Sequence, residues 1–204
     1  MAEAPEFGSR VLDALRQPLE EGEVPLRRSG GETVYPARVQ LVLAANPCPC
    51  ARPAGDRQCT CSSQTRRRYF GRLSGPLLDR VDLHVTLHPV GAAALLADQG
   101  VAESSPVVAA RVARARAAAA ERWARAGCRS NAAVPAALLR RPPYRLPRAA
   151  TRVVAEAVDK GTLSARGHDR VLKVAWTIAD LDGRTAPDAG DVAEALELRE
   201  GTAL

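Results

Sequence analysis

The stretch of residues 39–82 constrains the fold most strongly, because a mostly apolar run leads directly into a group of closely spaced cysteines. The run Val39–Ala45 is short enough to be a buried strand, and it stops at the polar residue Asn46. Cysteine pairs, an arginine-rich segment and the sequence Ser74–Asp82 follow. We expect a functional site to be assembled around this stretch.

Composition favours helical packing over a large sheet. The chain has 204 residues, enough for one domain or two small ones. Hydrophobic residues make up 46% but aromatic residues only 3%, and alanine and valine dominate, which favours closely packed helices. The net charge of +6 is compatible with binding to phosphate or nucleic acid and proves neither.

The sequence predicts no association with a membrane. No apolar run reaches the length of a membrane span, and the N-terminus lacks a basic segment followed by an apolar one. We expect a cytoplasmic protein, in which paired cysteines are more typical of metal ligands or thiols than of disulfides.

The first part of the chain predicts both helix and strand. Ser9 is expected to cap a short helix over 10–16. Alternating apolar residues on both sides of a glycine-containing turn predict a hairpin over 23–38. A further strand is expected over 83–87, after the buried strand 39–45.

The second part predicts helices alone, expected over 106–127, 147–160 and 165–181 and after Asp188. Ser164 and Asp188 are expected to be N-caps. The arginines of the first of these helices spread around its circumference and are expected to be solvated: Arg111, Arg114, Arg116, Arg122 and Arg125. The fold class is therefore α/β followed by all-α.

Four segments, taken in order, resemble the AAA+ ATPases of the magnesium-chelatase-like ComM (YifB) group: FGSRVLDALRQPLEEGEV, YPARVQLVLAANPCPC, SGPLLDRVDLHV and LSARGHDRVLKVAWTIADL. The resemblance implies that residues 1–92 are the C-terminal part of an AAA+ P-loop core with a Cys-rich insertion at 46–62. It also implies a helical lid over 93–204, a homo-oligomeric ring, ATP and Mg²⁺ as cofactors, and DNA branch migration during natural transformation.

The resemblance assigns roles to two residues of the first part. Asn46 matches sensor 1, a strand-end polar residue that orients the attacking water; the alternative is a strand-terminating Asn-Pro turn. Arg80 matches the arginine finger that reaches the neighbouring subunit's nucleotide. Its alternative is a surface ion pair with Asp79 or Asp82.

In the lid, Arg166 matches sensor 2, which contacts the nucleotide of its own subunit, and Arg170 lies one turn later. Either arginine fits the role under the resemblance. The alternative for both is a solvated position on a helix.

The chain departs from the family at its phosphate-binding residues. No G-x-x-x-x-G-K-[ST] sequence occurs in the 204 residues. Glu3 matches the water-polarising glutamate, but Ala2 stands where the family has the aspartate that binds magnesium. We therefore expect a truncated ATPase that binds ATP poorly and does not hydrolyse it alone. The alternative is a non-hydrolysing binding module, or the product of a decaying gene, that docks on an intact ring or on DNA.

Four cysteines form two C-x-C pairs separated by eight residues, Cys48 with Cys50 and Cys59 with Cys61. Four thiolates on one short loop are able to close a tetrahedral zinc site and order a proline-rich segment. Free thiols or a disulfide are the alternatives. A catalytic metal is not expected, because such a metal needs an open ligand position and none is evident here.

Arginines interleaved with aromatic residues follow the cysteines: Arg66, Arg67, Arg68 and Arg72 with Tyr69 and Phe70. The arginines are candidates to bind DNA phosphates, with stacking of a base on an aromatic ring. Pairing with acidic residues of the next subunit, or simple solvation, is the alternative.

Overall fold

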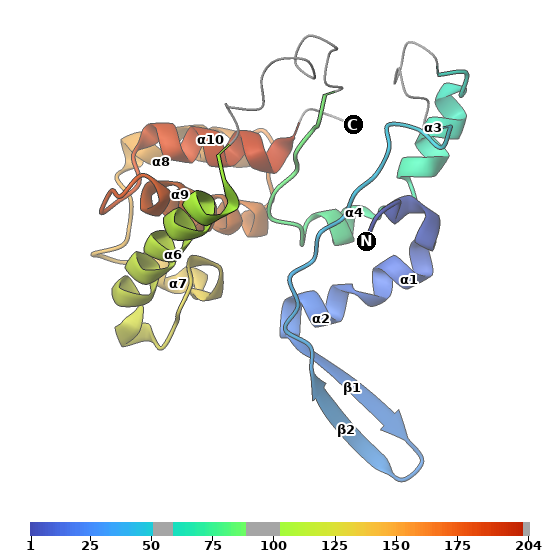
Figure 1. Cartoon of the computed structure of the whole chain (residues 1–204), viewed down its shortest axis with the longest axis horizontal. Helices are drawn as coiled ribbons and strands as arrows, with labels where there is room; N and C mark the ends of the chain where they lie inside the picture. Colours follow the sequence, from blue (N-terminus) through green and yellow to red (C-terminus); the bar gives the residue numbers. More distant parts are fainter. Residues whose placement is uncertain (51–58, 89–102, 202–204) are drawn as a thin grey trace. The chain divides into compact units, whose positions relative to one another are not determined.

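The computed structural model describes residues 1–50, 59–88 and 103–201, and the chain divides into two compact units, Met1–Val81 and Asp82–Ala203. The first unit is drawn in blue and cyan and the second mainly in green to red (Figure 1). No helix in the described ranges combines the length and the apolar composition that crossing a lipid bilayer requires.

The first unit packs short helices around a small core and carries one hairpin. The helices are η1 (Ala4–Phe7), α1 (Ser9–Ala14), α2 (Arg16–Glu21), α3 (Ser63–Phe70) and α4 (Gly75–Leu78). The buried residues of this core are Ala4, Leu12, Leu73 and Leu77. The N-cap of α1 is Gly8, so the prediction of Ser9 as the cap was wrong.

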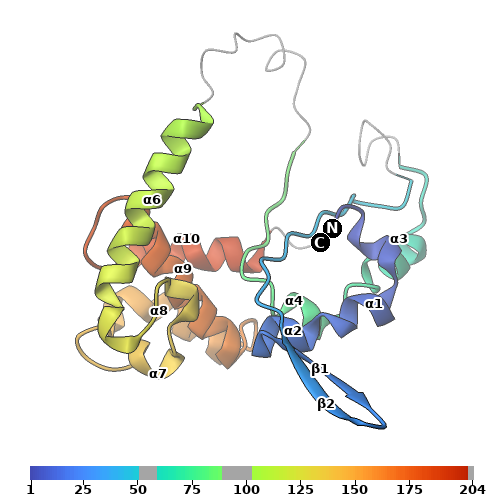
Figure 2. The ribbon, with the colours of Figure 1, turned by 60° about the horizontal axis from the view of Figure 1, so that its bottom comes forward.

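The hairpin prediction is confirmed. Strand β1 (Glu23–Arg28) pairs antiparallel with β2 (Gly31–Pro36), with Arg28 opposite Gly31 across the turn. Gly31 has φ 140°, a backbone conformation that residues with a Cβ rarely adopt. Both views show the two strands extending away from α1 and α2 (Figures 1 and 2).

The two other expected strands were wrong, since β1 and β2 are the only hydrogen-bonded strands in the described part of the chain. Residues 39–45 are mostly exposed, and Val42 reaches 69%. Residues 83–87 are likewise open to solvent, with Leu87 87% exposed. An apolar segment forms a buried strand only where neighbouring strands pair with it and pack against it. These two segments are apolar but have no such neighbouring strands in the described part of the chain.

The helix predictions for the second unit are confirmed. Its elements are α6 (Ser105–Arg122), η4 (Ala124–Ala126), η5 (Asn131–Ala133), α7 (Ala136–Leu139), α8 (Arg148–Asp159), α9 (Ala165–Leu181) and α10 (Ala189–Glu200). Ser164 accepts a hydrogen bond from the Gly167 backbone at 3.0 Å. Asp188 forms a reciprocal capping box with Asp191. Both are the expected N-caps.

Aromatic rings and one polar network occupy the core of this unit. Trp123 lies edge-on to Trp176, with ring centroids 5.6 Å apart. The Trp123 indole donates to Asn131 at 2.7 Å, and Asn131 in turn donates to Asp180 at 2.8 Å. Arg122 also reaches Asp180, so the prediction that this arginine is solvated was wrong.

Candidate nucleotide site and metal centre

Glu3 and Asn46, 43 positions apart in the sequence, meet in the first unit. The Asn46 side-chain amide donates to Glu3 Oε1 at 2.9 Å. Backbone bonds on either side hold the two segments together, from Ala4 to the Ala44 carbonyl at 2.8 Å and from Ala44 to the Met1 carbonyl at 3.0 Å. A carboxylate and a carboxamide are thereby placed where both are able to hold one small polar molecule.

The backbone of Glu3 adopts an unusual conformation to reach Asn46. Its φ of 54° and ψ of 45° lie in the left-handed region, and Glu3 is the one non-glycine residue with positive φ in the described ranges. This conformation costs on the order of 1 kcal/mol for a residue with a Cβ. Such strain is common at functional sites.

Tyr69 of α3 lies beside Asn46 and is 3% exposed. Burial raises the pKa of Tyr69, the Asn46 backbone lowers it in part, and the charges of Glu3 and Glu6 raise it further. The ring packs edge-on against Phe70, with centroids 5.3 Å apart. The buried Tyr69 ring is therefore not available to stack on a base, so the stacking prediction does not hold for this residue.

Arg80 lies in the turn that follows α4, with its side chain only 10% exposed. Its guanidinium forms an ion pair with Glu20 of α2 and donates to the Pro76 carbonyl at 2.7 Å. Sequence reasoning missed Glu20, because nothing in the local pattern links residues 60 positions apart. The fork geometry of the guanidinium is thus already used to hold a carboxylate.

The two candidate arginines of α9 differ in their surroundings. Arg166 is exposed in the first turn of α9. Arg170 forms an ion pair with Asp82, 88 positions earlier. Lys173, one turn further, has its pKa lowered first by burial and then by the charge of Arg170. The greater exposure of Arg166 makes it the better placed of the two to contact a ligand.

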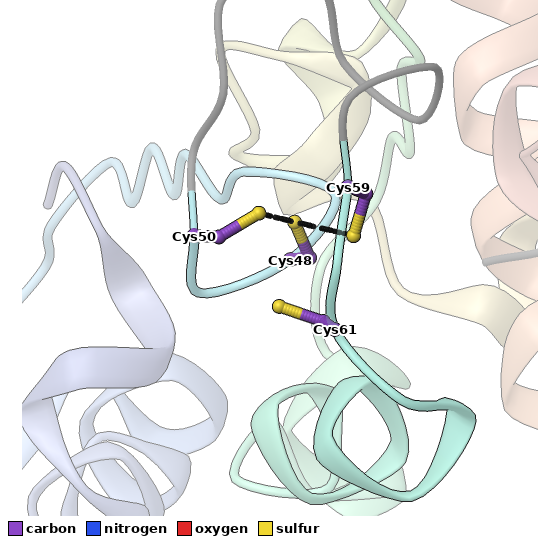
Figure 3. A group of neighbouring side chains, drawn as sticks. All are labelled: Cys48, Cys50, Cys59 and Cys61. Carbon is purple, nitrogen blue, oxygen red and sulfur yellow. Dashed lines mark hydrogen bonds between the residues drawn. The ribbon is translucent and has the colours of Figure 1, made fainter.

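The four predicted cysteine ligands come together in the first unit (Figure 3). The sulfur of Cys48 lies 3.0 Å from that of Cys50 and 3.4 Å from that of Cys59. All four Sγ atoms lie within 4.8 Å of one another, and none of the four cysteines is in a disulfide. Burial and hydrogen bonding to Cys50 raise the pKa of the Cys61 thiol. Residues 51–58 of the predicted Cys-rich insertion lie outside the described residues.

The predicted arginine cluster lies on α3, directly after the cysteines. Arg67 and Arg68 are exposed and Arg66 is half-buried. Ser62 caps the helix by accepting from the Thr65 backbone at 3.1 Å. The positive charges of Arg67 and Arg68 thus lie in the last turn of the helix, where they also complement its dipole.

Two family models match this chain, one over its first part and one over its second part. Residues 1–95 match the family model described as magnesium chelatase, subunit ChlI. Residues 102–199 match the model described as magnesium chelatase, subunit ChlI C-terminal. The two models together cover both units, apart from short segments between and after them.

Individual relatives match over most of the chain. An uncharacterized protein of Mycobacterium tuberculosis is 54% identical over 97% of this chain and 39% of its own length. Competence protein ComM of Haemophilus influenzae is 41% identical over 97% of the chain and 38% of its own length. The uncharacterized protein YifB of Escherichia coli is 40% identical over 88% of the chain and 34% of its own length. The chain thus spans less than two fifths of the length of these relatives.

Proposed function

This chain belongs to the magnesium-chelatase-like proteins of the ComM and YifB type, and we propose on that basis that it forms part of an ATP-driven motor acting on DNA. One relative carries the name competence protein, which supports a role in moving DNA strands during transformation. The observation that carries the proposal is the pairing of Glu3 with Asn46 at 2.9 Å.

The Glu3 and Asn46 side chains suit the positioning of a nucleophilic water. A carboxylate accepts a proton from the water. A carboxamide that hydrogen-bonds to the water orients the water molecule, so that the lone pair of its oxygen points at the atom under attack. The backbone bonds around Ala44 hold both groups in place before any ligand arrives. In this scheme Glu3 is the base and Asn46 orients the water.

Arg80 and Arg166 supply positive charge to the phosphates of the nucleotide. Arg80 acts in trans on the nucleotide of a neighbouring subunit, after exchanging its Glu20 partner for a phosphate oxygen. Arg166 acts in cis, because it is exposed at the start of a helix. A guanidinium suits both tasks, since it is always charged and binds two oxygens at once.

ATP and Mg²⁺ fit the residues of this chain only in part. The Glu3–Asn46 pair and the arginines provide a water site and phosphate contacts. A phosphate loop is not among the 204 residues, and Ala2 offers no oxygen to a metal. Hydrolysis therefore requires phosphate-binding residues from sequence other than these 204 residues, and the first unit then forms the later part of an AAA+ P-loop core.

A chimera tests the proposal directly. The chain replaces the 198 aligned residues of the mycobacterial relative, and ATP hydrolysis and DNA strand exchange are measured for the chimera and for the chain alone. We expect turnover by the chimera and none by the chain alone. Asn46→Ala should lower kcat by at least about 100-fold while nucleotide binding persists.

Gln40→Ala is the matched control, because Gln40 is an exposed polar residue on the same segment. It should leave kcat unchanged. Undiminished turnover by the Asn46→Ala chimera would remove the proposed role of the Glu3–Asn46 pair. Turnover by the chain alone would show that a phosphate loop of the usual sequence is not needed.

A further inference from the structure

The sulfur atoms of four cysteines form a group whose dimensions match one metal ion. A Zn–S bond of about 2.3 Å in a regular tetrahedron separates the sulfurs by about 3.8 Å. The distances here are 3.0 Å between Cys48 and Cys50, 3.4 Å between Cys48 and Cys59, and 3.8 Å between Cys50 and Cys59. Cys61 completes the group, with every pair of sulfurs within 4.8 Å. Figure 3 shows its side chain pointing toward the other three.

The same distances argue against disulfides. A disulfide requires about 2.0 Å between sulfurs, and the shortest separation among Cys48, Cys50 and Cys59 is 3.0 Å. The sulfurs also do not divide into two separate pairs, because Cys48 lies close to both Cys50 and Cys59. Neighbouring thiolates repel one another, so the four groups stay protonated unless a divalent ion binds and stabilises their thiolate forms.

The ligand set selects the metal. Four thiolates in tetrahedral array are typical of structural zinc and of iron–sulfur centres, whereas calcium and magnesium require oxygen ligands. All four positions are taken by protein, which leaves no position for a substrate. The chemistry is therefore that of a closed structural site.

The cysteines join two segments that both lead to Asn46, namely the loop that follows it and helix α3. Cys48 is buried two residues after Asn46. Cys61 directly precedes Ser62, the N-cap of α3. The same helix carries Tyr69, which packs beside Asn46. A metal at the cysteines would fix both the loop that follows Asn46 and the helix that supports it.

We propose that Cys48, Cys50, Cys59 and Cys61 bind one Zn²⁺ ion and that this ion holds the loop after Asn46 against α3. The proposal rests on the cysteine geometry alone and does not depend on ATP hydrolysis. The zinc site is a structural element of the first unit, and its removal loosens the residues around Asn46 before it affects the helical second unit.

The test uses the untagged chain, purified without chelators. Elemental analysis should give about one zinc per chain. Replacement of zinc by Co²⁺ in the wild-type chain should give the visible absorption bands of a tetrahedral thiolate site. A thiol-specific mercurial should release the zinc as four thiols react. These measurements need no variant and so do not depend on whether a mutant folds.

Two variants then locate the ion. Cys59→Ser/Cys61→Ser should lose the zinc, and hydrogen exchange should speed up in residues 46–48 and α3 but not in α9. Cys128→Ser is the matched control, because Cys128 lies in the second unit and is absent from the cluster; it should keep one zinc. Native protein free of metal, iron with sulfide in place of zinc, or zinc retained by the double variant would overturn the proposal.

Discussion

The guanidinium of Arg122 on α6 forms a two-pronged ion pair with the carboxylate of Asp180 on α9, across 58 positions of sequence. One of its bonds measures 3.0 Å, and the same guanidinium lies over the Trp176 ring at 4.4 Å from the centroid. Asp180 is 4% exposed and also accepts from Asn131. A charge in such surroundings is tolerated only because it is fully paired.

Asp180→Ala should therefore destabilise the second unit strongly. It leaves Arg122 half-buried without its carboxylate and removes one of the two acceptors of the Asn131 side-chain amide, which costs about 3–5 kcal/mol. Urea unfolding followed by tryptophan fluorescence measures the loss, since Trp123 and Trp176 lie in the same core. Arg125→Ala, an exposed arginine in the next turn, should change stability by no more than about 0.5 kcal/mol. A similar small change for Asp180→Ala would contradict the interpretation.

The free energy of unfolding should fall in acid, because Asp188, the N-cap of α10, becomes protonated. Backbone hydrogen bonds from Asp191 and Gly190, with the charge of Arg184, hold the pKa of Asp188 below its usual value. Because the folded-state pKa is depressed, this stabilisation is present above the unfolded-state pKa of about 4 and is lost as pH falls through the folded-state pKa.

The stability difference between wild type and Asp188→Ala should accordingly be constant near neutral pH and should shrink below about pH 4. Urea midpoints measured across this range check it. Asp159→Ala serves as a control, because Asp159 lies at the other end of a helix, α8, where a negative charge is not stabilised. A difference that persists unchanged in strong acid would contradict the cap mechanism.

Glu3→Gln should separate nucleotide binding from hydrolysis in the chimera with the mycobacterial relative. The amide keeps the shape of the side chain but accepts no proton from water, so kcat should fall by about 100-fold or more with little change in nucleotide affinity. Glu32→Gln, on the exposed hairpin, is the matched control. Loss of binding together with turnover would show that Glu3 acts on structure and not as a base.

Arg80 and Glu20 should respond differently when each is replaced in that chimera. If the guanidinium reaches a neighbouring subunit, Arg80→Ala abolishes turnover, and Arg80→Lys restores little because an ammonium binds oxygen at one point only. Glu20→Ala removes the partner of Arg80 within its own unit and should preserve turnover. Equal losses for Arg80→Ala and Glu20→Ala would assign the ion pair a purely structural role.

The exposed arginines of α3 should contribute to DNA binding through charge. Arg67→Ala/Arg68→Ala removes two phosphate contacts, so the slope of log K against log salt concentration should become shallower by about 2 for duplex DNA. Arg27→Ala/Arg28→Ala removes the same charge from the exposed hairpin and should alter the slope much less. Fluorescence anisotropy with labelled DNA at several salt concentrations measures both.

Helices with local start and stop signals were predictable from sequence. Ser164 and Asp188 cap α9 and α10 through side chains within three residues of the bonds they make, and the period of apolar residues marks the buried face. The hairpin within residues 23–38 was predictable for the same reason, because a two-residue turn joins partners that are close in sequence. Local chemistry sufficed in each case.

Long-range pairing was not predictable in the same way. Arg122 looked solvated because its partner Asp180 lies 58 positions later, and the period of one helix gives no information about that partner. Residues 39–45 are apolar, but the prediction that they form a buried strand was wrong, since burial depends on neighbouring strands that the local sequence does not reveal. Within the candidate site, the family resemblance identified Glu3 and Asn46, but their direct hydrogen bond was visible only in three dimensions.

The exposed run Val39–Ala45 also affects how the isolated chain behaves in solution. An apolar segment that is mostly exposed to solvent favours association with another polypeptide. Concentrated preparations of the 204-residue chain should therefore self-associate through this run. Val42→Lys, which places a charge at an apolar residue that is 69% exposed, should raise the solubility limit without unfolding either unit.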